Sequence, residues 1–512
     1  MDFESILFPG AAAEAIGRTS EATADYLADL HLNEIIAAVL KGHEPYDLTA
    51  FFRLPLRTED EVAYRHEILR DLEDEGLRGH VEAFTTAMQR VREEIALAGK
   101  LYYQYQKAIW FLDAVVDYCQ AVRALAKALS DGAPRSRGMI AFGSYLRAYA
   151  GSGQFTELEA RSGSLKDGLR DVVYRVQIKG SRVTVRAYEP DPDYSREIEE
   201  TFARFRQGDV KDYGVTFPSY PEMNHVEAEV LERVAKLYPD LFASLNAFAD
   251  GRQDFLDELL IRFDREVHFY LAYLAFIRRL QGAGLSFCVP EMRLDNKAVL
   301  AEETFDLALA QNLVESGSNV VTNHFHLQDG ERIFVVSGPN QGGKTTFART
   351  FGQLHHFGRL GLPVPGRRAH LLLCDEIFTL FARTEQVEDQ RGRLQGELMR
   401  LRAILEAAGE RSILIMNETF SSTTLEDARL LGRAALERVI RKDMLCVYVT
   451  FVDELSTLGE ATVSMVSNVD PDDPTVRTYE ILRRPADGLA YAMAVARKRG
   501  VTYDMLKRRL AR

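Results

Sequence analysis

The chain has 512 residues, of which 46% are hydrophobic and 27% charged, and it is therefore long enough for two or more domains with a large core. Its formal net charge of −13 argues against a uniformly basic nucleic-acid binder, so any DNA contact has to come from a local basic patch. It has no apolar run long enough to span a bilayer, no signal-peptide pattern and no CxxC pair among its four cysteines, which predicts a cytoplasmic protein without a membrane span, disulfide framework or zinc site.

Long helices are predicted through most of the first 290 residues. Apolar side chains recur three or four positions apart, as on one face of a helix, at Val81, Phe84, Met88, Val91 and Ile95. Residues 101–129 and 255–277 continue this helical pattern over many turns. Helices of this length indicate either levers or an ordinary bundle, and periodicity leaves both open. We therefore predict a helical core and lever region over residues 1–290.

One segment of this region alternates with a period of two. The stretch "VYRVQIKGSRVTVRAY" contains a central Gly-Ser dipeptide, which predicts a β-hairpin with a type II′ turn at about residues 172–188. With a two-residue turn, four cations share one face of the hairpin: Arg175, Lys179, Arg182 and Arg186. The face carries no acid, and the opposite face is apolar. The basic face is either a solvated surface or a contact for an anion such as DNA, and the segment alone leaves both open.

The pattern changes again near residue 290. Short apolar runs such as "ERIFVVSGPN" and "RSILIMNE" alternate with helical stretches, which is typical of a mostly parallel sheet with helices between its strands. We therefore predict an α/β domain over residues 291–512. The fold class expected for the whole chain is α+α/β.

The stretch "VVSGPNQGGKTT" fits the phosphate-loop pattern G-x-x-x-x-G-K-[ST] and lies between a predicted strand and a predicted helix. Its glycines let backbone N–H groups turn towards an anion, and the helix dipole favours negative charge there. We expect Lys344 to reach the β- and γ-phosphates and Thr345 to bind Mg²⁺. The predicted nucleotide-binding loop consists of Gly338, Pro339, Asn340, Gln341, Gly342, Gly343, Lys344, Thr345 and Thr346.

The strand "SILIMNE" is the best candidate to complete this site. In phosphate-loop enzymes, the last two residues of such a strand hold the metal and orient the attacking water. Glu418 is the candidate catalytic base, whereas Asn417 at the metal position brings oxygen but no negative charge. The alternative is that Asn417 and Glu418 only end a strand, without catalysis.

These motifs resemble the ATPase domain of the MutS family, the DNA mismatch repair ATPases related to ABC transporters. "GPNQGGKTT" is similar to the family's phosphate loop, and "MNETFSSTT" to its Asp-Glu strand and following loop. "VVTNHFHL" resembles the segment before the loop, with Asn323 matching a nucleotide-site position. Residues 374–405 resemble the stretch that holds the signature helix, and residues 487–510 resemble the helical segment that helps two ATPase domains pair.

The resemblance implies an ABC-type ATPase that uses ATP and Mg²⁺ and acts as a homodimer on DNA. The helix near Gly392 would face the nucleotide of the other subunit, and Asn340 would contact the nucleotide of its own. A looser likeness over residues 48–290 would make the long helices the family's levers and the hairpin its DNA clamp. We expect a short form, without the mismatch-recognition and connector domains, because the helical core starts almost at residue 1.

Four positions depart from the family pattern. Asn417 replaces the magnesium-associated Asp, and Phe451 stands where a His usually senses the γ-phosphate. Gly392 stands where the signature helix usually offers Ser, and Val320 stands where an aromatic ring commonly stacks on adenine. Together these changes predict slow hydrolysis with nucleotide binding retained.

Three functions remain open on the sequence. The first is an ATP-dependent DNA-binding ATPase in repair or recombination, working as a nucleotide-switched clamp. The second is a scaffold that binds nucleotide with little or no hydrolysis, as Asn417, Phe451 and Gly392 suggest. The third is an ATPase that acts on a protein partner, as the acidic net charge suggests.

Overall fold

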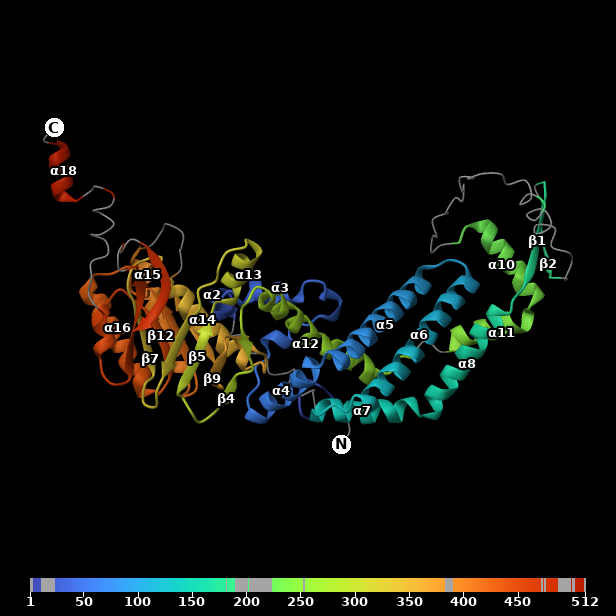
Figure 1. Ribbon diagram of the computed structural model, residues 1–512, viewed down its shortest axis with the longest axis horizontal. Coiled ribbons are helices and arrows are strands. Elements are labelled where there is room, and N and C mark those ends of the chain that lie inside the picture. The colour runs from blue at the N-terminus through green and yellow to red at the C-terminus, as the bar shows by residue number, and fades with distance from the viewer. Residues whose placement is uncertain are drawn as a thin grey trace. The chain divides into compact units, whose positions relative to one another are not determined.

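The computed structural model describes residues 3–10, 24–180, 182–188, 201, 223–251, 254–382, 390–470, 473, 476–486, 499 and 502–510. The chain forms two units, each with its own core (Figure 1). The first unit contains Met1–Asp2, Asp74–Pro134 and Met139–Ile261, and the second contains Phe3–Glu73, Arg135–Gly138 and Arg262–Arg512. Within the described ranges, no helix combines the length and the apolar composition needed to cross a membrane.

The first unit is built from long helices and one hairpin. Its elements are α5 (Glu75–Lys100), α6 (Gln104–Asp131), most of α7 (Arg137–Ala150), α8 (Gly153–Arg170), β1 (Tyr174–Lys179), β2 (Arg182–Ala187), α10 (His225–Leu237) and α11 (Pro239–Gly251). Helices α5 and α6 lie side by side (Figure 1), and the apolar face predicted for α5 is buried from Val81 to Val91. At the start of α5, the carboxylate of Asp74 accepts a hydrogen bond from the backbone of Leu77 and caps the helix.

The predicted hairpin forms with the predicted register. Arg175 pairs with Arg186 and Lys179 pairs with Arg182, so the four cations share one face. The apolar face is more exposed than the pattern implied, because every residue of β1 is exposed and Ile178 keeps 70% of its surface accessible. On β2, Val183 and Val185 of the apolar face are partly buried.

The second unit contains the sheets and most of the remaining helices. Its helices are α2 (Ala24–Asp29), α3 (Leu32–Leu40), α4 (Glu59–Glu73), most of α12 (Glu258–Gly282), α13 (Leu307–Glu315), α14 (Lys344–Gly358), α15 (Gln390–Ala407), α16 (Leu425–Arg441) and α18 (Tyr503–Leu510), with 3₁₀ helices at η2 (Glu44–Tyr46), η3 (Phe51–Arg53) and η4 (Asp453–Thr457). Its strands are β3 (Phe287–Cys288), β4 (Glu291–Arg293), β5 (Val299–Thr304), β6 (Asn323–Leu327), β7 (Ile333–Ser337), β8 (Val364–Pro365), β9 (Arg368–Leu372), β10 (Ile377–Phe381), β11 (Ile413–Asn417), β12 (Leu445–Val449), β13 (Thr462–Val469) and β14 (Arg477–Arg483).

The main sheet has six strands in the order β10-β11-β12-β7-β13-β14. All neighbours are parallel except β13 and β14, which are antiparallel. A second sheet has the order β4-β9-β5-β6, and β3 pairs with β8. The sequence had predicted a mostly parallel sheet but not this second sheet, whose strands are short.

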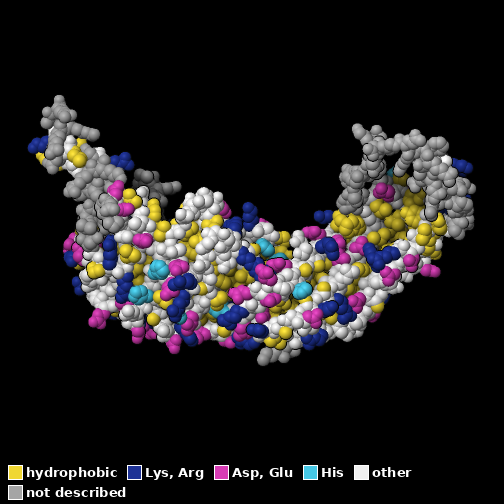
Figure 2. Space-filling model, viewed as in Figure 1, with side chains coloured by type: hydrophobic (Ala, Val, Ile, Leu, Met, Phe, Trp, Pro, Cys, Tyr) yellow, Lys and Arg dark blue, Asp and Glu magenta, His cyan; other side chains and the backbone are white. Residues whose placement is uncertain are grey.

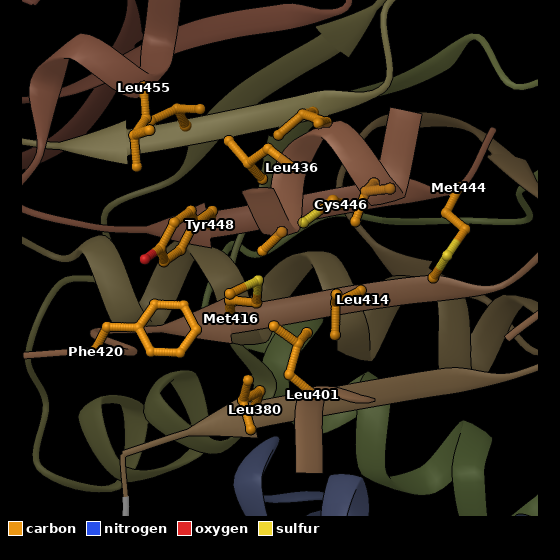
Figure 3. Packing of buried hydrophobic residues seen from close by; sticks show 14 of the residues in the cluster. Leu380, Leu401, Leu414, Met416, Phe420, Leu436, Met444, Cys446, Tyr448 and Leu455 are labelled. Atoms are coloured by element: carbon orange, nitrogen blue, oxygen red, sulfur yellow. The ribbon is translucent and has the colours of Figure 1, made fainter. Parts of the chain in front are cut away.

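Alternate residues of the central strands face one hydrophobic core (Figure 3). Leu414 and Met416 of β11 lie beside Cys446 and Tyr448 of β12 in this core, and Leu436 of α16 packs against them. The residues between them on each strand are also buried, on the other face of the sheet. Burial on both faces explains why these strands read as continuous apolar runs in the sequence.

The two units do not divide at residue 290, where the sequence placed a domain boundary. Residues 3–73 and 262–290 belong to the unit that contains the main sheet. The hydroxyl of Thr379 on β10 donates to Asp29 at 2.6 Å, and the Gln353 amide of α14 donates to the carbonyl of Leu30 at 2.9 Å. These contacts hold α2 and the start of α3 against β10 and α14. The sequence pattern of residues 24–40 does not predict them.

A buried carboxyl group makes the stability of the second unit depend on pH. Glu266 of α12 accepts hydrogen bonds from the Ser5 hydroxyl at 2.9 Å and the Ile6 N–H at 2.8 Å, but burial raises its pKa to about 7. Between about pH 4.5 and 7 the folded chain keeps a proton on Glu266 that the unfolded chain has released. The contribution of Glu266 to the free energy of unfolding therefore falls as the pH rises through this range. We expect Glu266→Gln to remove on the order of 3 kcal/mol of this pH dependence.

Urea unfolding of both proteins at pH 5 and pH 8 measures this effect. Glu258→Gln, on the same helix but exposed, serves as the control and should unfold like the wild type at both pH values. If Glu266→Gln lost stability between the two pH values as steeply as the wild type, the carboxyl group would not be responsible.

Candidate nucleotide-binding site

The strand register brings the two predicted motifs to one edge of the main sheet. Asn417 pairs with Val449, and Val449 pairs with Val336, so β11, β12 and β7 end at the same level. The phosphate loop leaves β7 there, and Glu418 follows β11 there. A parallel sheet gathers polar residues at the carboxyl ends of its strands, which is the usual place of a ligand site in such folds.

The phosphate loop has the backbone of an anion-binding turn. Gly338, Gln341 and Gly343 have positive φ angles of 113°, 59° and 90°, and α14 begins directly after them at Lys344. Gly342 is required for another reason. A Cβ atom there would lie 2.1 Å from the hydroxyl oxygen of Ser467, which donates a hydrogen bond to the Gly342 carbonyl at 2.7 Å.

Lys344 is held against the loop that it follows. Its Nζ donates to the carbonyl oxygens of Gly338 and Pro339, both at 2.9 Å, and approaches the Asn340 side chain at 3.4 Å. Burial lowers the pKa of this ammonium group, and the Glu418 carboxylate acts in the opposite direction. The charge of Lys344 is therefore fixed beside the backbone that would cradle phosphates.

Thr345 and Asn417 connect the two motifs directly. The Thr345 hydroxyl donates to the Asn417 side-chain oxygen at 2.9 Å, across 72 residues of sequence. These two oxygens fit Mg²⁺, a hard cation that keeps several waters and takes oxygen ligands. Neither group carries charge, and the described residues contain no cluster of three acidic, His or Cys ligands. The negative charge around a bound Mg²⁺ would therefore come mainly from the nucleotide phosphates.

The backbone that follows β11 is strained in two places. Glu418 and Phe420 both have positive φ angles, 51° and 63°, which residues other than glycine rarely adopt. The N–H of Glu418 donates to the Val449 carbonyl at 2.9 Å, and the N–H of Phe420 donates to the buried Glu397 carboxylate at 2.9 Å. These bonds hold the exposed Glu418 side chain at the edge of the sheet.

Asn323, which matched a nucleotide-site position in the sequence, bonds to β14. Its side-chain amide donates to the Tyr479 carbonyl at 3.2 Å and accepts from the Ile481 N–H at 2.6 Å. Asn323 therefore fastens β14 beside β6. Tyr479 has a φ of 63°, keeps 52% of its surface exposed and lies against Gly343 of the phosphate loop.

Ser467 and Tyr479 are site residues that the sequence did not reveal. They follow the phosphate loop by more than 120 residues and belong to no motif, so only the strand order places them beside it. The Tyr479 side chain is exposed and its backbone lies near Gly343 of the loop, whereas Val320, at the position expected for a stacking aromatic, is half-buried.

Among the described residues, the remaining predicted positions make no hydrogen bond or ion pair with the phosphate loop. Gly392 is exposed and lies near the start of α15, two residues after Gln390. Phe451 follows β12 and is 50% exposed. Most of the closing segment, residues 487–498 and 500–501, lies outside the described residues.

Comparison with known proteins identifies this domain. A family model described as MutS domain V matches residues 334–510. The DNA mismatch repair protein MutS of Clostridium kluyveri is 24% identical over 299 residues, covering 56% of this chain and 33% of that protein. Residues 334–510 form a domain of the MutS type. The Endonuclease MutS2 of Thermus thermophilus is also similar, at 29% identity over 195 residues, which cover 37% of this chain and 26% of that protein.

The MutS match includes every strand and helix that forms the nucleotide site except β6. It begins at residue 334 in β7, four residues before Gly338, and runs through α15, β11 and β14. The aligned part spans about a third of the length of the first of these relatives and about a quarter of the second. The first unit of the chain lies outside the domain V match.

Proposed function

We propose that this chain, through its MutS-type domain, binds ATP with Mg²⁺, hydrolyses it, and uses the nucleotide state to control its grip on DNA during repair or recombination. The hydrogen bond from Thr345 to Asn417 carries this proposal, because it joins the phosphate-loop helix to the strand end that bears Glu418. A loop and a strand that merely ended at the same sheet edge would not need this contact. The names of the relatives, a mismatch repair protein and an endonuclease, support DNA as the partner.

The residues divide the work of hydrolysis. The N–H groups of the phosphate loop and the ammonium group of Lys344 bind phosphate oxygens and stabilise negative charge that develops on them. Thr345 and Asn417 hold the metal, which, when bound, neutralises phosphate charge. Glu418 orients a water and accepts its proton. Tyr479 provides a flat surface beside the loop for the base of the nucleotide.

We propose a homodimer in which α15 of one subunit approaches the nucleotide of the other. The first turn of α15 is exposed at Gly392, and its backbone N–H groups favour negative charge. Apolar side chains are also exposed on α15 and α16, at Met399 (65%), Leu425 (61%) and Leu430 (55%). Exposed apolar side chains of this size are typical of surfaces that a partner covers.

The hairpin is the proposed DNA contact. Arg175 faces Arg186 and Lys179 faces Arg182 across the strands, so four cations gather on one face, and such a cluster attracts an anion. DNA phosphates provide that anion. Tyr238 anchors the base of the hairpin, since its hydroxyl donates to the Val173 carbonyl at 2.6 Å and accepts from the Val173 N–H at 3.3 Å.

Replacing all four hairpin cations with Gln should weaken duplex binding and flatten its salt dependence. Each phosphate contact that is lost lowers the slope of log K against log salt by about one. Anisotropy titrations at several salt concentrations measure the slope, and DNA-stimulated ATP turnover of the same variant shows whether the nucleotide site senses this contact. Matched, mismatched and branched duplexes are compared in both assays.

The control for the hairpin variant changes two cations of α8, Arg161 and Arg170, to Gln. They lie in the same unit but pair with acids on their own helix, so their loss should leave the slope unchanged. If the wild type shows no salt-dependent binding to any duplex, the proposal of DNA binding fails. An ATPase that acts on a protein partner, which the net charge of −13 favours, would then be the better assignment.

A second candidate function is a nucleotide-gated scaffold with very slow hydrolysis. The uncharged metal site of Thr345 and Asn417 favours it, as does Phe451 after β12. We expect Asn417→Asp to raise ATP turnover by about 10-fold or more, because a carboxylate strengthens Mg²⁺ binding. Asn296→Asp, an exposed site elsewhere in the same unit, is the matched control. A wild type that already turns over at ordinary rates, with no gain in Asn417→Asp, would exclude the scaffold.

A further inference from the structure

Two histidines from distant parts of the sequence lie next to each other in the second unit. His43 directly precedes η2, and His268 lies on α12. Their Nδ1 atoms are 3.2 Å apart, across 225 residues of sequence. His268 keeps only 7% of its surface exposed and His43 is half-buried, so the pair lies where the core meets the surface.

The spacing of the two rings matches that of two neighbouring ligands on a tetrahedral metal ion. Zinc–nitrogen bonds of about 2.0–2.1 Å place two ligand nitrogens about 3.3 Å apart and their imidazole centroids about 5.2 Å apart. The separations between His43 and His268 are 3.2 Å for the nitrogens and 5.1 Å for the centroids. A hydrogen bond between the rings gives a similar nitrogen separation, and a metal ion would take the place of its proton.

A buried carboxyl group lies on the far side of one ring. Asp264 is one helical turn before His268, its side chain is 1% exposed, and its Oδ1 lies 3.7 Å from the His268 Nε2. A carboxylate on this side favours the tautomer that has its proton on Nε2, which leaves the Nδ1 lone pair to face His43. Metal-binding histidines usually have such a second partner, because it fixes both the tautomer and the ring orientation.

The turn that contains His43 is fastened to α12 beside the pair. The ring of Tyr46 lies against the ring of His268, with centroids 3.6 Å apart. The guanidinium group of Arg265 donates to the Tyr46 carbonyl at 2.8 Å and to the Asp47 carbonyl at 2.7 Å. These contacts position both rings in advance, so a metal ion does not have to order its ligands when it binds.

We propose that His43 and His268 bind one Zn²⁺ through their Nδ1 atoms and so hold the turn after α3 on α12. Imidazole nitrogen suits zinc, whereas magnesium and calcium take oxygen ligands. Among the described residues no group of three His, Cys, Asp or Glu side chains gathers here, so water completes the coordination. The sequence predicted no zinc site because its cysteines form no CxxC pair, and histidines 225 residues apart give no such signal. The inference is independent of the proposed nucleotide and DNA binding.

Zinc titration of the nucleotide-free full chain tests this inference, in a large excess of Mg²⁺ that competes for oxygen sites. We expect His43→Gln and His268→Gln each to lower the number of bound Zn²⁺ ions by one per chain. Asp264→Asn keeps both ligands and should weaken the binding of this ion by about 10–100-fold. Zn²⁺ should also raise the midpoint of thermal unfolding of the wild type but not that of His43→Gln. Circular dichroism without metal confirms that each variant is folded.

A second pair of histidines provides the matched control. His324 and His326 lie two residues apart on β6 and are both exposed. Figure 2 shows His side chains (cyan) at the surface of the part of this unit that contains the sheets. Changing both to Gln should leave the ion between His43 and His268 in place, together with its effect on thermal unfolding.

Three results would overturn the inference. The first is a wild type that binds no Zn²⁺ in excess Mg²⁺, because the contact between the rings is then only a hydrogen bond. The second is an ion count that stays the same in both His43→Gln and His268→Gln. The third is the loss of all Zn²⁺ binding in the variant of His324 and His326. None of these results changes the proposals on ATP or DNA.

Discussion

Glu418→Gln is expected to lower steady-state ATP turnover by about 10²–10⁴-fold while ATP affinity stays within a few-fold of the wild type. Gln keeps the size of the side chain but cannot accept a proton from water at neutral pH. The strained backbone at this position, with a φ of 51°, should persist, since the N–H of residue 418 still donates to Val449. Phosphate release measures turnover, and a fluorescent ATP analogue measures affinity.

The matched control for this prediction is Glu426→Gln. Glu426 lies in the first turn of α16, is exposed and pairs with Arg429 on its own helix at 2.6 Å. Its replacement should leave both turnover and affinity unchanged. If Glu418→Gln hydrolysed ATP as fast as the wild type, a different group would have to activate the water, and the site would need to be assigned again.

Lys344→Ala should affect binding as well as turnover. The ammonium group is held by the carbonyls of Gly338 and Pro339, and these three groups together shape the loop. Its removal takes away a positive charge beside the phosphates, which should lower turnover by about 10²–10³-fold and weaken ATP binding at the same time. Isothermal titration with Mg-ATP and phosphate release measure the two effects separately.

Lys442→Ala provides the comparison for this variant. Lys442 follows α16 and donates to the Ala408 carbonyl at 2.9 Å, so its loss also removes a lysine bound to backbone oxygen, away from the phosphate loop. We expect it to bind and hydrolyse ATP normally. If the wild type, Lys344→Ala and Glu418→Gln were all equally inactive, hydrolysis would not be the work of this chain.

The features that the sequence predicted well are those encoded within a few residues. The hairpin register follows from its alternation and its two-residue turn, and the structure confirms the pairing of Arg175 with Arg186. The phosphate loop and its flanking strand and helix follow from a contiguous motif. The meeting of Thr345 with Asn417 was expected because parallel strands bring their carboxyl ends together.

The features that the sequence missed depend on the order of strands in the sheet. Ser467 braces Gly342 across 125 residues because β13 lies beside β7, and Asn323 holds Tyr479 across 156 residues because β6 approaches β14. No periodicity in a single strand encodes its neighbours. The docking of residues 24–40 on the main sheet was missed for the same reason, since it depends on single hydrogen bonds such as that from Thr379 to Asp29.

The Phe420 N–H donates a hydrogen bond to Glu397, and this bond connects α15 to the chain that follows Glu418. Glu397 lies on the helix whose exposed first turn contains Gly392, and Phe420 lies two residues after Glu418. A shift of α15 along its axis would therefore act on the backbone of residues 418–420, where Glu418 and Phe420 have positive φ angles. By thermodynamic reciprocity, if nucleotide in this site changes how tightly α15 engages another surface, that surface changes the affinity for nucleotide by the same factor. The 2.9 Å hydrogen bond from the Phe420 N–H to Glu397 is the contact through which such a coupling would act.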